Sequence, residues 1–369
     1  MNTTSKYYRL LAVALASFLF VAACSGDDSE AEDSDATTTA SSEPATDETG
    51  DGDADNDGDA DGQSDAVEQV SATIGIANIA PVEALLLVEE GFREGLEVCS
   101  AEVDAEIVSR NAEGDGSALG PIVSEFLDSN ADLILAISTP VLQATVSANE
   151  ADGRGTPVLF GAVTDPFAAG AAVSATEKPD WLTGWQADAP VTGMFDIAAE
   201  IVPDLSVIGV AYDPSQVNSE RALAKMQDEA DARGLVIETA TIADSSEVGA
   251  AAQALAGRDV DVFFVPTDSI LVNGLAGMVA VADDFDIPMI AQDSNTTVAG
   301  AAIGTGLDYR GDGVRNGEYA CQILTGQATP ADFPIQQFDK ELVAYNSASA
   351  EAQGFEVPAW ILESGVDNG

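Results

Sequence analysis

The sequence contains no histidine, and this absence excludes a broad range of enzyme chemistry. Hydrolases that use a histidine base, and most catalytic zinc sites, need an imidazole. A phosphate-binding Gly-x-x-x-x-Gly-Lys-Ser/Thr loop is also missing, and no Gly-x-Gly-x-x-Gly motif follows the first apolar segment. Paired carboxylates are the remaining catalytic alternative, but no spacing singles out a pair. We therefore expect no enzyme activity, no cofactor and no metal site.

Basic residues are scarce. Lys and Arg number 13 against 64 Asp and Glu, which gives a formal net charge of −51. A surface of this sign repels nucleic-acid phosphates and anionic lipid headgroups. We therefore expect no nucleic-acid partner, and a well-hydrated, acidic protein.

Long apolar runs and cysteines are also few. Beyond the N-terminal region no run is long enough to predict a membrane-spanning helix. The part predicted to fold contains two cysteines, Cys99 and Cys321. Two alternatives remain for them, a disulfide bond or two buried free thiols.

Residues 1–23 have the features of a secretory signal peptide. Lys6 and Arg9 supply the positive end, and the uncharged run 10–23 ends in Val-Ala-Ala directly before Cys24. This ending matches the lipobox at which bacterial lipoproteins are cleaved and acylated. The sequence therefore predicts an extracytoplasmic protein anchored to the cell membrane by lipidated Cys24; an ordinary secretory signal followed by a chance cysteine is the alternative.

Residues 24–70 are predicted to be a disordered acidic tether. The segment has no Lys or Arg, holds 17 of the 64 acidic residues and has hardly any large apolar side chain. An EF-hand-like pattern occurs in it, formed by Asp57, Asp59, Asp61, Gly62 and Glu68. Ser64 stands where an apolar residue would anchor such a loop, and the Asp/Gly repeat produces the pattern easily by chance. We therefore expect no calcium site here.

Short apolar runs alternate with helical segments over the rest of the chain. These runs are continuous rather than alternating, which is typical of parallel strands covered by helices on both faces. The runs are 73–79, 133–138, 158–163, 207–212, 260–265 and 288–291. After the first run, Leu85, Val88, Phe92 and Leu96 recur at the spacing of a helix that packs on a sheet.

About eight βα units are predicted in total, too many for one simple doubly wound sheet. Two similar halves are separated near 181–190 by a segment with Pro, Gly and Trp. We therefore predict an α/β fold of two doubly wound parallel-sheet lobes joined by a hinge. A closed barrel of eight units is the alternative.

Two polar turns, Ser138-Thr139-Pro140 and Thr164-Asp165-Pro166, each lie where a predicted strand ends and a helix begins. Carboxyl ends of strands and free helix N–H groups form ligand-binding crevices in α/β folds, and hydroxyl groups there can help to hold a carboxylate. The alternative is that these side chains only cap their helices.

Several motifs in order resemble one family. They are Ile74-Gly75-Ile76, Gly91-Phe92, the block from Ala136 to Ala144 (Ala-Ile-Ser-Thr-Pro-Val-Leu-Gln-Ala), the block from Val163 to Gly170 (Val-Thr-Asp-Pro-Phe-Ala-Ala-Gly), Thr183-Gly184, Asn218-Ser219, Pro266-Thr267-Asp268-Ser269 and Gly306-Leu307-Asp308-Tyr309. From about 74 to 361 the chain resembles ABC-transporter substrate-binding proteins of the tryptophan- and tyrosine-binding lipoprotein type. The sequence departs from its relatives at Pro81-Val82-Glu83, where many have Glu-His-Pro, at Ser269, where Asn is usual, and at Trp185 in the hinge.

The resemblance implies a type I periplasmic binding protein fold whose chain returns to lobe one after the Asp293 region. Lobe one would comprise 71–186 completed by 299–329, and lobe two 187–298 completed by 330–366. The implied function is a solute-binding lipoprotein, expected as a monomer, that delivers a small molecule to ABC permease subunits. A ligand sensor that reports to a membrane receptor, or a cell-surface enzyme, is the alternative.

The expected ligand is an amino acid or a similar zwitterion with an apolar or aromatic side chain. Its ammonium needs an anionic partner, because an unpaired buried charge is costly, and Asp268 and Asp308 are the candidates. The predicted ligand-binding residues are Asn78, Ser138, Thr139, Thr164, Asp165, Tyr212, Asn218, Ser219, Asp268, Ser269 and Asp308.

Overall fold

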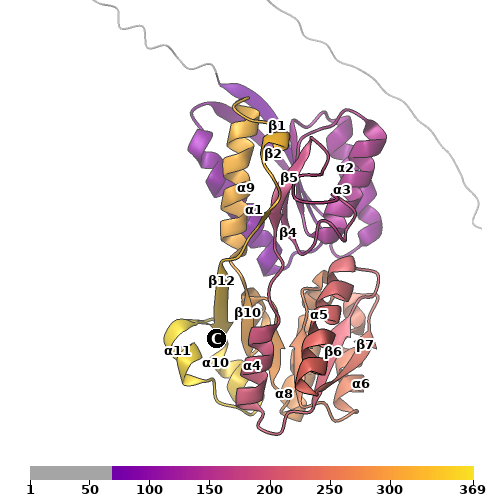
Figure 1. The fold of residues 1–369 in the computed structure, drawn as a ribbon, viewed down its shortest axis with the longest axis vertical. Coiled ribbons are helices and arrows are strands. Elements are labelled where there is room, and N and C mark those ends of the chain that lie inside the picture. Colours follow the sequence, from indigo (N-terminus) through magenta and orange to yellow (C-terminus); the bar gives the residue numbers. More distant parts are fainter. Residues whose placement is uncertain (1–68) are drawn as a thin grey trace, which may run out of the picture. The chain divides into compact units, whose positions relative to one another are not determined.

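The first lobe is built on a six-stranded sheet in which every neighbouring pair is parallel. The structure is a computed structural model that describes residues 69–369. In spatial order the strands are β11 (Gln336–Gln337), β5 (Leu182–Gln186), β4 (Val158–Val163), β3 (Leu133–Ile137), β1 (Val70–Asn78) and β2 (Val103–Asn111). The helices of this lobe are α1 (Glu83–Leu96), α2 (Leu119–Asp128), α3 (Thr139–Asp152) and α9 (Tyr309–Leu324) (Figure 1). All five residues of β3 are buried, because helices cover both faces of the sheet.

The second lobe is built on a seven-stranded sheet. In spatial order its strands are β13 (Val366–Asp367), β12 (Glu341–Tyr345), β10 (Ile303–Leu307), β9 (Met289–Ala291), β8 (Val262–Val265), β6 (Val207–Tyr212) and β7 (Val236–Thr241). Its helices are α4 (Thr192–Ile201), α5 (Val217–Arg233), α6 (Val248–Ala256), α7 (Ser269–Asn273), α8 (Leu275–Phe285), α10 (Ser347–Ala352) and α11 (Ala359–Ser364). Of the described strand pairs, β10–β12 alone is antiparallel. The two open sheets confirm the prediction of two α/β lobes and show that the barrel alternative is wrong.

Within residues 69–369 the chain passes between the lobes three times, after β5, after β10 and after β11 (Figure 1). The second passage lies later than the predicted boundary at 299, because β10 hydrogen-bonds with β9 and β12 of the second sheet. Glycines at 304 and 306 let the backbone at Asp293 lie against this strand, where a Cβ would come within 2.5–2.8 Å. The predicted start of the last segment at 330 is also too early, because β11 pairs with β5 in lobe one.

Helix α9, which enters lobe one from the second lobe, packs directly against α1 through backbone. Four glycines line this contact, two from each helix: Gly91, Gly95, Gly313 and Gly317. A Cβ on any of them would lie only 2.1–2.3 Å from a carbonyl oxygen of the other helix. The predicted apolar stripe of α1 faces the core, where Val88 and Phe92 are fully buried. Close contact between these helices therefore depends on glycine, which has no side chain, at all four positions.

A disulfide bond joins the same pair of helices. Cys99, just beyond the end of α1, is bonded to Cys321 on α9, with the two Cα atoms 5.6 Å apart. Of the two alternatives that the sequence left for these cysteines, the structure contains the bonded one. The bridge closes a loop that includes the whole of the sequence between the two cysteines.

Replacing both Cys99 and Cys321 by Ala should lower the free energy of unfolding by roughly 2–4 kcal/mol, because the bond restricts the unfolded chain. Denaturation by urea, followed by far-ultraviolet circular dichroism, measures the difference. Wild-type protein treated with a reductant is the control and should lose a similar amount. An unchanged midpoint in both samples would contradict this role for the bridge.

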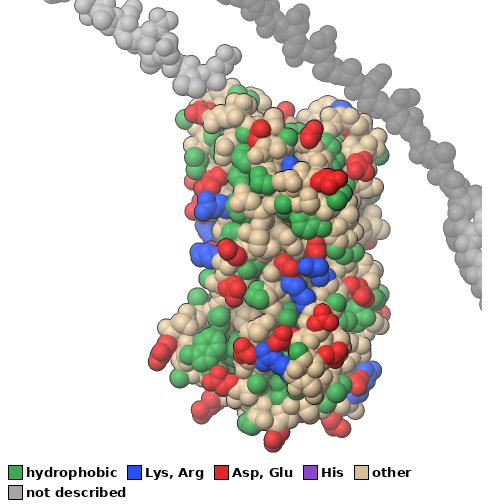
Figure 2. Space-filling model, viewed as in Figure 1, with side chains coloured by type: hydrophobic (Ala, Val, Ile, Leu, Met, Phe, Trp, Pro, Cys, Tyr) green, Lys and Arg blue, Asp and Glu red, His purple; other side chains and the backbone are tan. Residues whose placement is uncertain are grey.

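Among the residues that the structure describes, no helix combines the length and the apolar character needed to cross a membrane. Cys24, the signal peptide and the acidic tether lie outside the described residues, so those predictions remain predictions. Asp and Glu side chains lie over both lobes on the face shown in Figure 2, with Lys and Arg in a few small groups among them.

Candidate functional site

A cavity lies between the two lobes, beside the carboxyl ends of β3, β4, β8 and β9. Its polar lining residues are Ser138, Thr139, Thr164, Asn218, Thr267, Asp268, Ser269 and Asp293. The remaining lining residues are Val82, Ala84, Leu85, Ala162, Val272 and Tyr309. Among the described residues, no Lys or Arg lines it. The cavity thus combines an apolar wall with neutral and acidic polar groups.

Four polar side-chain atoms that line this cavity are buried without a hydrogen-bond partner among the described residues. They are Ser138 Oγ, Thr139 Oγ1, Asn218 Oδ1 and Thr267 Oγ1. Such groups are rare in folded proteins, because each costs about 1–3 kcal/mol when left unsatisfied. Their concentration around one cavity indicates a site shaped for a polar molecule.

The N-terminus of α3 points its first-turn N–H groups toward this region. These groups have no partners inside the helix and carry a partial positive charge. Ser138, which precedes the helix, has a positive φ of 91°, an uncommon conformation for a residue other than glycine. With the hydroxyls of Ser138 and Thr139, the helix start can hold an anionic group such as a carboxylate.

Asp268 lines the cavity, but its carboxylate is already occupied by the protein. One oxygen accepts the Ile270 and Leu271 N–H groups at 3.0 Å and the Gln216 amide at 3.1 Å. The other accepts the Asp213 N–H at 2.7 Å and the Ser219 hydroxyl at 2.6 Å. Burial raises the pKa of Asp268, and these hydrogen bonds oppose that rise. Asp268 therefore caps α7 and fixes the start of α5, and it has no capacity left for a ligand ammonium.

Asp308 does not line the cavity. Its carboxylate caps α9 through the Gly311 N–H at 3.0 Å and forms an ion pair with Lys340. Burial would raise its pKa, but the hydrogen bonds from Lys340 and Gly311 outweigh this and keep the pKa of Asp308 below its usual value. The structure thus gives both predicted ammonium partners other roles.

Asp293 is the acidic residue that sequence reasoning missed. It follows β9 as Asp268 follows β8, lines the cavity and is buried. Its Oδ1 accepts the N–H and the side-chain amide of Asn295, both at 3.0 Å, and Oδ2 makes no hydrogen bond within the described part of the protein. Burial, with a smaller contribution from Glu83, raises the pKa of Asp293 to about 6. The rule that polar residues at strand ends face the ligand would have found it.

Six of the eleven predicted ligand residues line the cavity: Ser138, Thr139, Thr164, Asn218, Asp268 and Ser269. The other five do not line it. Asn78 accepts the Ala80 N–H at the end of β1, and Tyr212 is half-buried at the end of β6. Ser219 bonds Asp268, and Asp165 accepts N–H groups of its own turn and pairs with Arg221.

Trp185, the unusual residue of the predicted hinge, lies on β5 and does not line the cavity. Its ring lies 5.7 Å from that of Tyr319 on α9 and 6.2 Å, edge-on, from that of Phe338. The tryptophan therefore fixes the segment that follows β11 against lobe one.

A second buried carboxyl group, Asp312 on α9, lies behind the cavity wall. Its Oδ2 accepts the N–H of Ala162, which lines the cavity, at 2.7 Å, and its Oδ1 accepts the Asn316 amide at 2.9 Å. Burial is the main cause that raises the pKa of Asp312 to about 7, and the nearby Asp308 carboxylate adds to it. Asn316 Oδ1 has no hydrogen-bond partner among the described residues.

Three comparisons place the chain among known proteins. Residues 73–367 match the family model described as ABC transporter substrate binding protein. The chain therefore belongs to the ABC transporter substrate-binding protein family, whose members are solute-binding proteins outside the cytoplasm and not enzymes. It is 31% identical over 282 residues to the tyrosine-binding protein of Clostridioides difficile strain R20291, covering 76% of this chain and 80% of that relative.

Two solved structures are similar over nearly their whole length. One is the ABC domain of Streptococcus pneumoniae in complex with L-Trp, with a TM-score of 0.73 and 25% identity, covering 80% of this chain and 98% of that one. The other is the ligand-free, open structure of a Clostridium difficile substrate-binding protein with adhesive properties. Its TM-score is 0.59 at 30% identity, with 81% of this chain and 100% of that one covered.

Protonation of Asp312 should make the stability of the protein depend on pH. Its pKa is raised by folding, so between about pH 4 and 7 the folded state keeps a proton that the unfolded state has released. The contribution of Asp312 to the free energy of unfolding is therefore largest below that pH range and falls as the pH rises through it.

Asp312→Asn keeps a neutral side chain of similar shape, whose amide oxygen can accept the Ala162 N–H in place of Oδ2. Relative to wild type, the variant should gain stability on the order of 3 kcal/mol between pH 5 and pH 8, because two pKa units separate pH 5 from the Asp312 pKa of about 7 and each corresponds to about 1.4 kcal/mol. Urea unfolding at both pH values measures this. Asp293→Asn serves as the comparison, because Asp293 is the other buried carboxyl group with a raised pKa. If the free energy of unfolding changed equally with pH in wild type and in Asp312→Asn, the assignment to Asp312 would be contradicted.

Proposed function

We propose that this protein is the solute-binding lipoprotein of an ABC importer and captures an amino acid-like zwitterion between its two lobes. The observation that carries this proposal is a set of four polar atoms without partners in the described part of the chain. They surround one cavity that Asp293 lines and that no described Lys or Arg lines. A molecule with one anionic and one cationic end matches these groups. The names of two relatives, a tyrosine-binding protein and a protein complexed with L-Trp, support this ligand class.

The ligand carboxylate would bind at the start of α3. Ser138 and Thr139 offer hydroxyl donors there, Thr164 lines the same cavity, and the first-turn N–H groups add their partial positive charge. Neutral donors of this kind hold an anion without a buried basic residue. The negative field of the protein does not prevent this, because the local N–H groups act at hydrogen-bond distance.

The ligand ammonium would bind Asp293. Oδ2 of this carboxylate is free for a donor from the ligand, whereas Asp268 is filled by five protein donors and Asp308 lies outside the cavity. A bound ammonium would also offset the desolvation free energy that disfavours the ionised form of the buried Asp293. Asp293, rather than Asp268 or Asp308, is therefore the proposed partner of the ammonium.

The ligand side chain would contact the apolar part of the wall. Val82 and Leu85 of lobe one face the cavity with Val272 of lobe two, and all three are more than half buried. The wall therefore suits an apolar or aromatic side chain better than a charged one.

Asp293→Asn should weaken binding of L-tyrosine or L-tryptophan by roughly 10- to 100-fold, because the ammonium loses its charged partner while the shape of the site is kept. For wild type, affinity should rise with pH through about 6, since Asp293 must lose its proton to pair with the ammonium. Isothermal titration calorimetry measures both effects. Asp308→Asn is the matched control and should bind normally; equal losses in the two variants would refute the site.

Lipid anchoring and delivery to permease subunits are parts of the same proposal. The Val-Ala-Ala-Cys ending at Cys24 supports acylation of a processed N-terminus, and the family supports an importer role for a monomeric binding protein. The acidic tether would then set the distance between the binding lobes and the membrane.

Cys24→Ala should release the protein from the membrane fraction into the soluble extracytoplasmic fraction, because no acyl chain can be attached. Fractionation of cells followed by immunoblotting measures the distribution. Ser25→Ala, which leaves the cysteine in place, is the control and should stay with the membrane. A Cys24→Ala protein that also stays with the membrane would show that the lipobox interpretation is wrong.

A further inference from the structure

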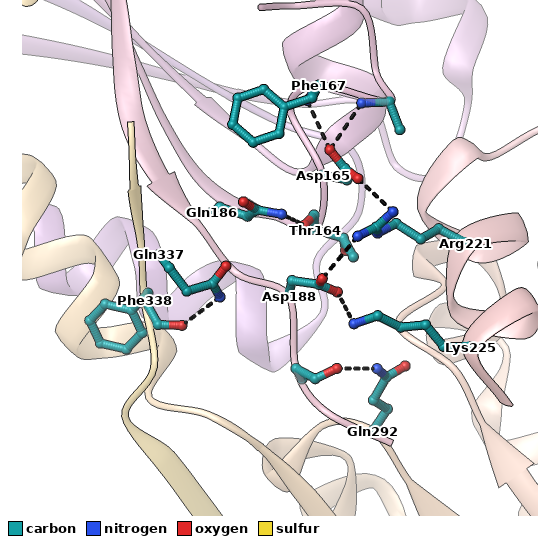
Figure 3. Close-up of polar contacts among 12 residues, drawn as sticks. Thr164, Asp165, Phe167, Gln186, Asp188, Arg221, Lys225, Gln292, Gln337 and Phe338 are labelled. Carbon is teal, nitrogen blue, oxygen red and sulfur yellow. Dashed lines mark hydrogen bonds and ion pairs between the residues drawn. The ribbon is translucent and has the colours of Figure 1, made fainter. Parts of the chain in front are cut away.

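A cluster of four charged side chains spans the two lobes and one of the segments between them (Figure 3). The Arg221 guanidinium on α5 binds Asp165 Oδ2 at 2.7 Å and Asp188 Oδ2 at 3.2 Å. Lys225, one helical turn further along, binds Asp188 Oδ1 at 2.5 Å. Figure 2 shows basic side chains grouped at the level where the lobes meet.

The partners of this cluster come from three different places. Asp165 follows β4 in lobe one, Asp188 lies in the segment after β5, and Arg221 belongs to lobe two. Thr164 and Asn218, which line the ligand cavity, are close neighbours of Asp165 and Arg221 in the chain. The cluster therefore lies beside the ligand cavity.

Asp165 is held ready for its partner by its own lobe. Its Oδ1 accepts the N–H groups of Phe167 and Ala168, both at 2.9 Å, which leaves Oδ2 directed at Arg221. The Asp165 side chain is 8% exposed and that of Arg221 is 37% exposed. An ion pair with one buried and preorganised member contributes more than a pair on the open surface.

The two contacts of Arg221 respond differently to separation of the lobes. Moving lobe one away from lobe two breaks the Arg221–Asp165 pair. The Asp188 pairs with Arg221 and Lys225 lie on the side of lobe two and the connecting segment, so they can persist and keep the guanidinium aimed at lobe one. The fold overlays better on the L-Trp complex than on the open, ligand-free relative, although the latter is more similar in sequence.

We propose that Arg221 is a positioning residue for ligand binding, which latches lobe two to Asp165 of lobe one and slows ligand release without touching the ligand. The latch forms only when the lobes are closed, so it acts on the dissociation rate and leaves the association rate nearly unchanged. This goes beyond the proposed function, because it concerns closure of the lobes and holds whichever solute binds.

Arg221→Met keeps the aliphatic stem and removes the charge. Dissociation of radiolabelled L-tyrosine or L-tryptophan, chased with unlabelled amino acid from full-length protein in detergent, should be about tenfold faster than in wild type. Arg233→Met is the matched control on the same helix, because Arg233 pairs with Asp196 and Glu229 inside lobe two. A wild-type dissociation rate in Arg221→Met would overturn the latch, as would an equal increase in Arg233→Met.

A double-mutant cycle separates the latch from a general loss of stability. Asp165→Asn keeps the acceptor for Phe167 and Ala168 but removes the charge that Arg221 binds. The double variant with Arg221→Met should release ligand no faster than the faster of the two single variants, because both changes remove the same ion pair. Raising NaCl from 0.05 M to 0.5 M should speed release from wild type more than from Arg221→Met, because the variant lacks the Arg221–Asp165 pair that salt screens. Additive effects, or equal salt responses, would overturn the proposal.

A measurement without ligand keeps the latch testable if the ligand assignment fails. Nitroxide labels at Ser124→Cys on α2 and Ala232→Cys on α5, both exposed, report the distance between the lobes. Pulsed electron paramagnetic resonance at low salt should show a larger share of long distances in Arg221→Met than in wild type. If no amino acid binds wild type, the ligand proposal fails, and identical distance distributions would then overturn the latch as well.

Discussion

The backbone contact between α1 and α9 is the constraint on which the rest of the molecule depends. These helices come from distant parts of the chain, and they approach so closely only because glycines stand at all four contact positions. Once α9 is fixed, Tyr309 lines the cavity and Asp312 supports its wall through Ala162. Any larger side chain at Gly91 or Gly317 would push α9 outward and move these groups away from the ligand.

Much of the fold could be predicted from the sequence, because buried parallel strands leave continuous apolar runs such as Leu133–Ile137. The sheet to which β10 belongs could not be predicted, because the composition of its Ile-Gly-Thr-Gly-Leu sequence suits either sheet. Its assignment rests on hydrogen bonds with β9 and β12, which are far apart in the sequence. The lipid anchor and tether rest on the sequence alone.

The cavity residues, too, could be predicted only in part from the sequence. The rule about strand ends led to Ser138, Thr164 and Asp268, which all line the cavity. The rule could not tell that Asp268 is filled by donors from a turn fifty residues earlier, or that Asp293 keeps a free oxygen. Position relative to a strand is local information, whereas the availability of a carboxylate depends on which distant groups already bind it.

The disulfide and the glycine contact also dictate an order of assembly. Synthesis and export both proceed from the N-terminus, so β1 to β5 emerge long before α9 does. Until α9 emerges, the glycine face of α1 in the first lobe therefore stays uncovered. Most strands of the second sheet are contiguous in sequence, so this sheet can form early. The first lobe thus stays incomplete until nearly the whole chain has emerged, and a chain in that state exposes apolar surface that favours aggregation.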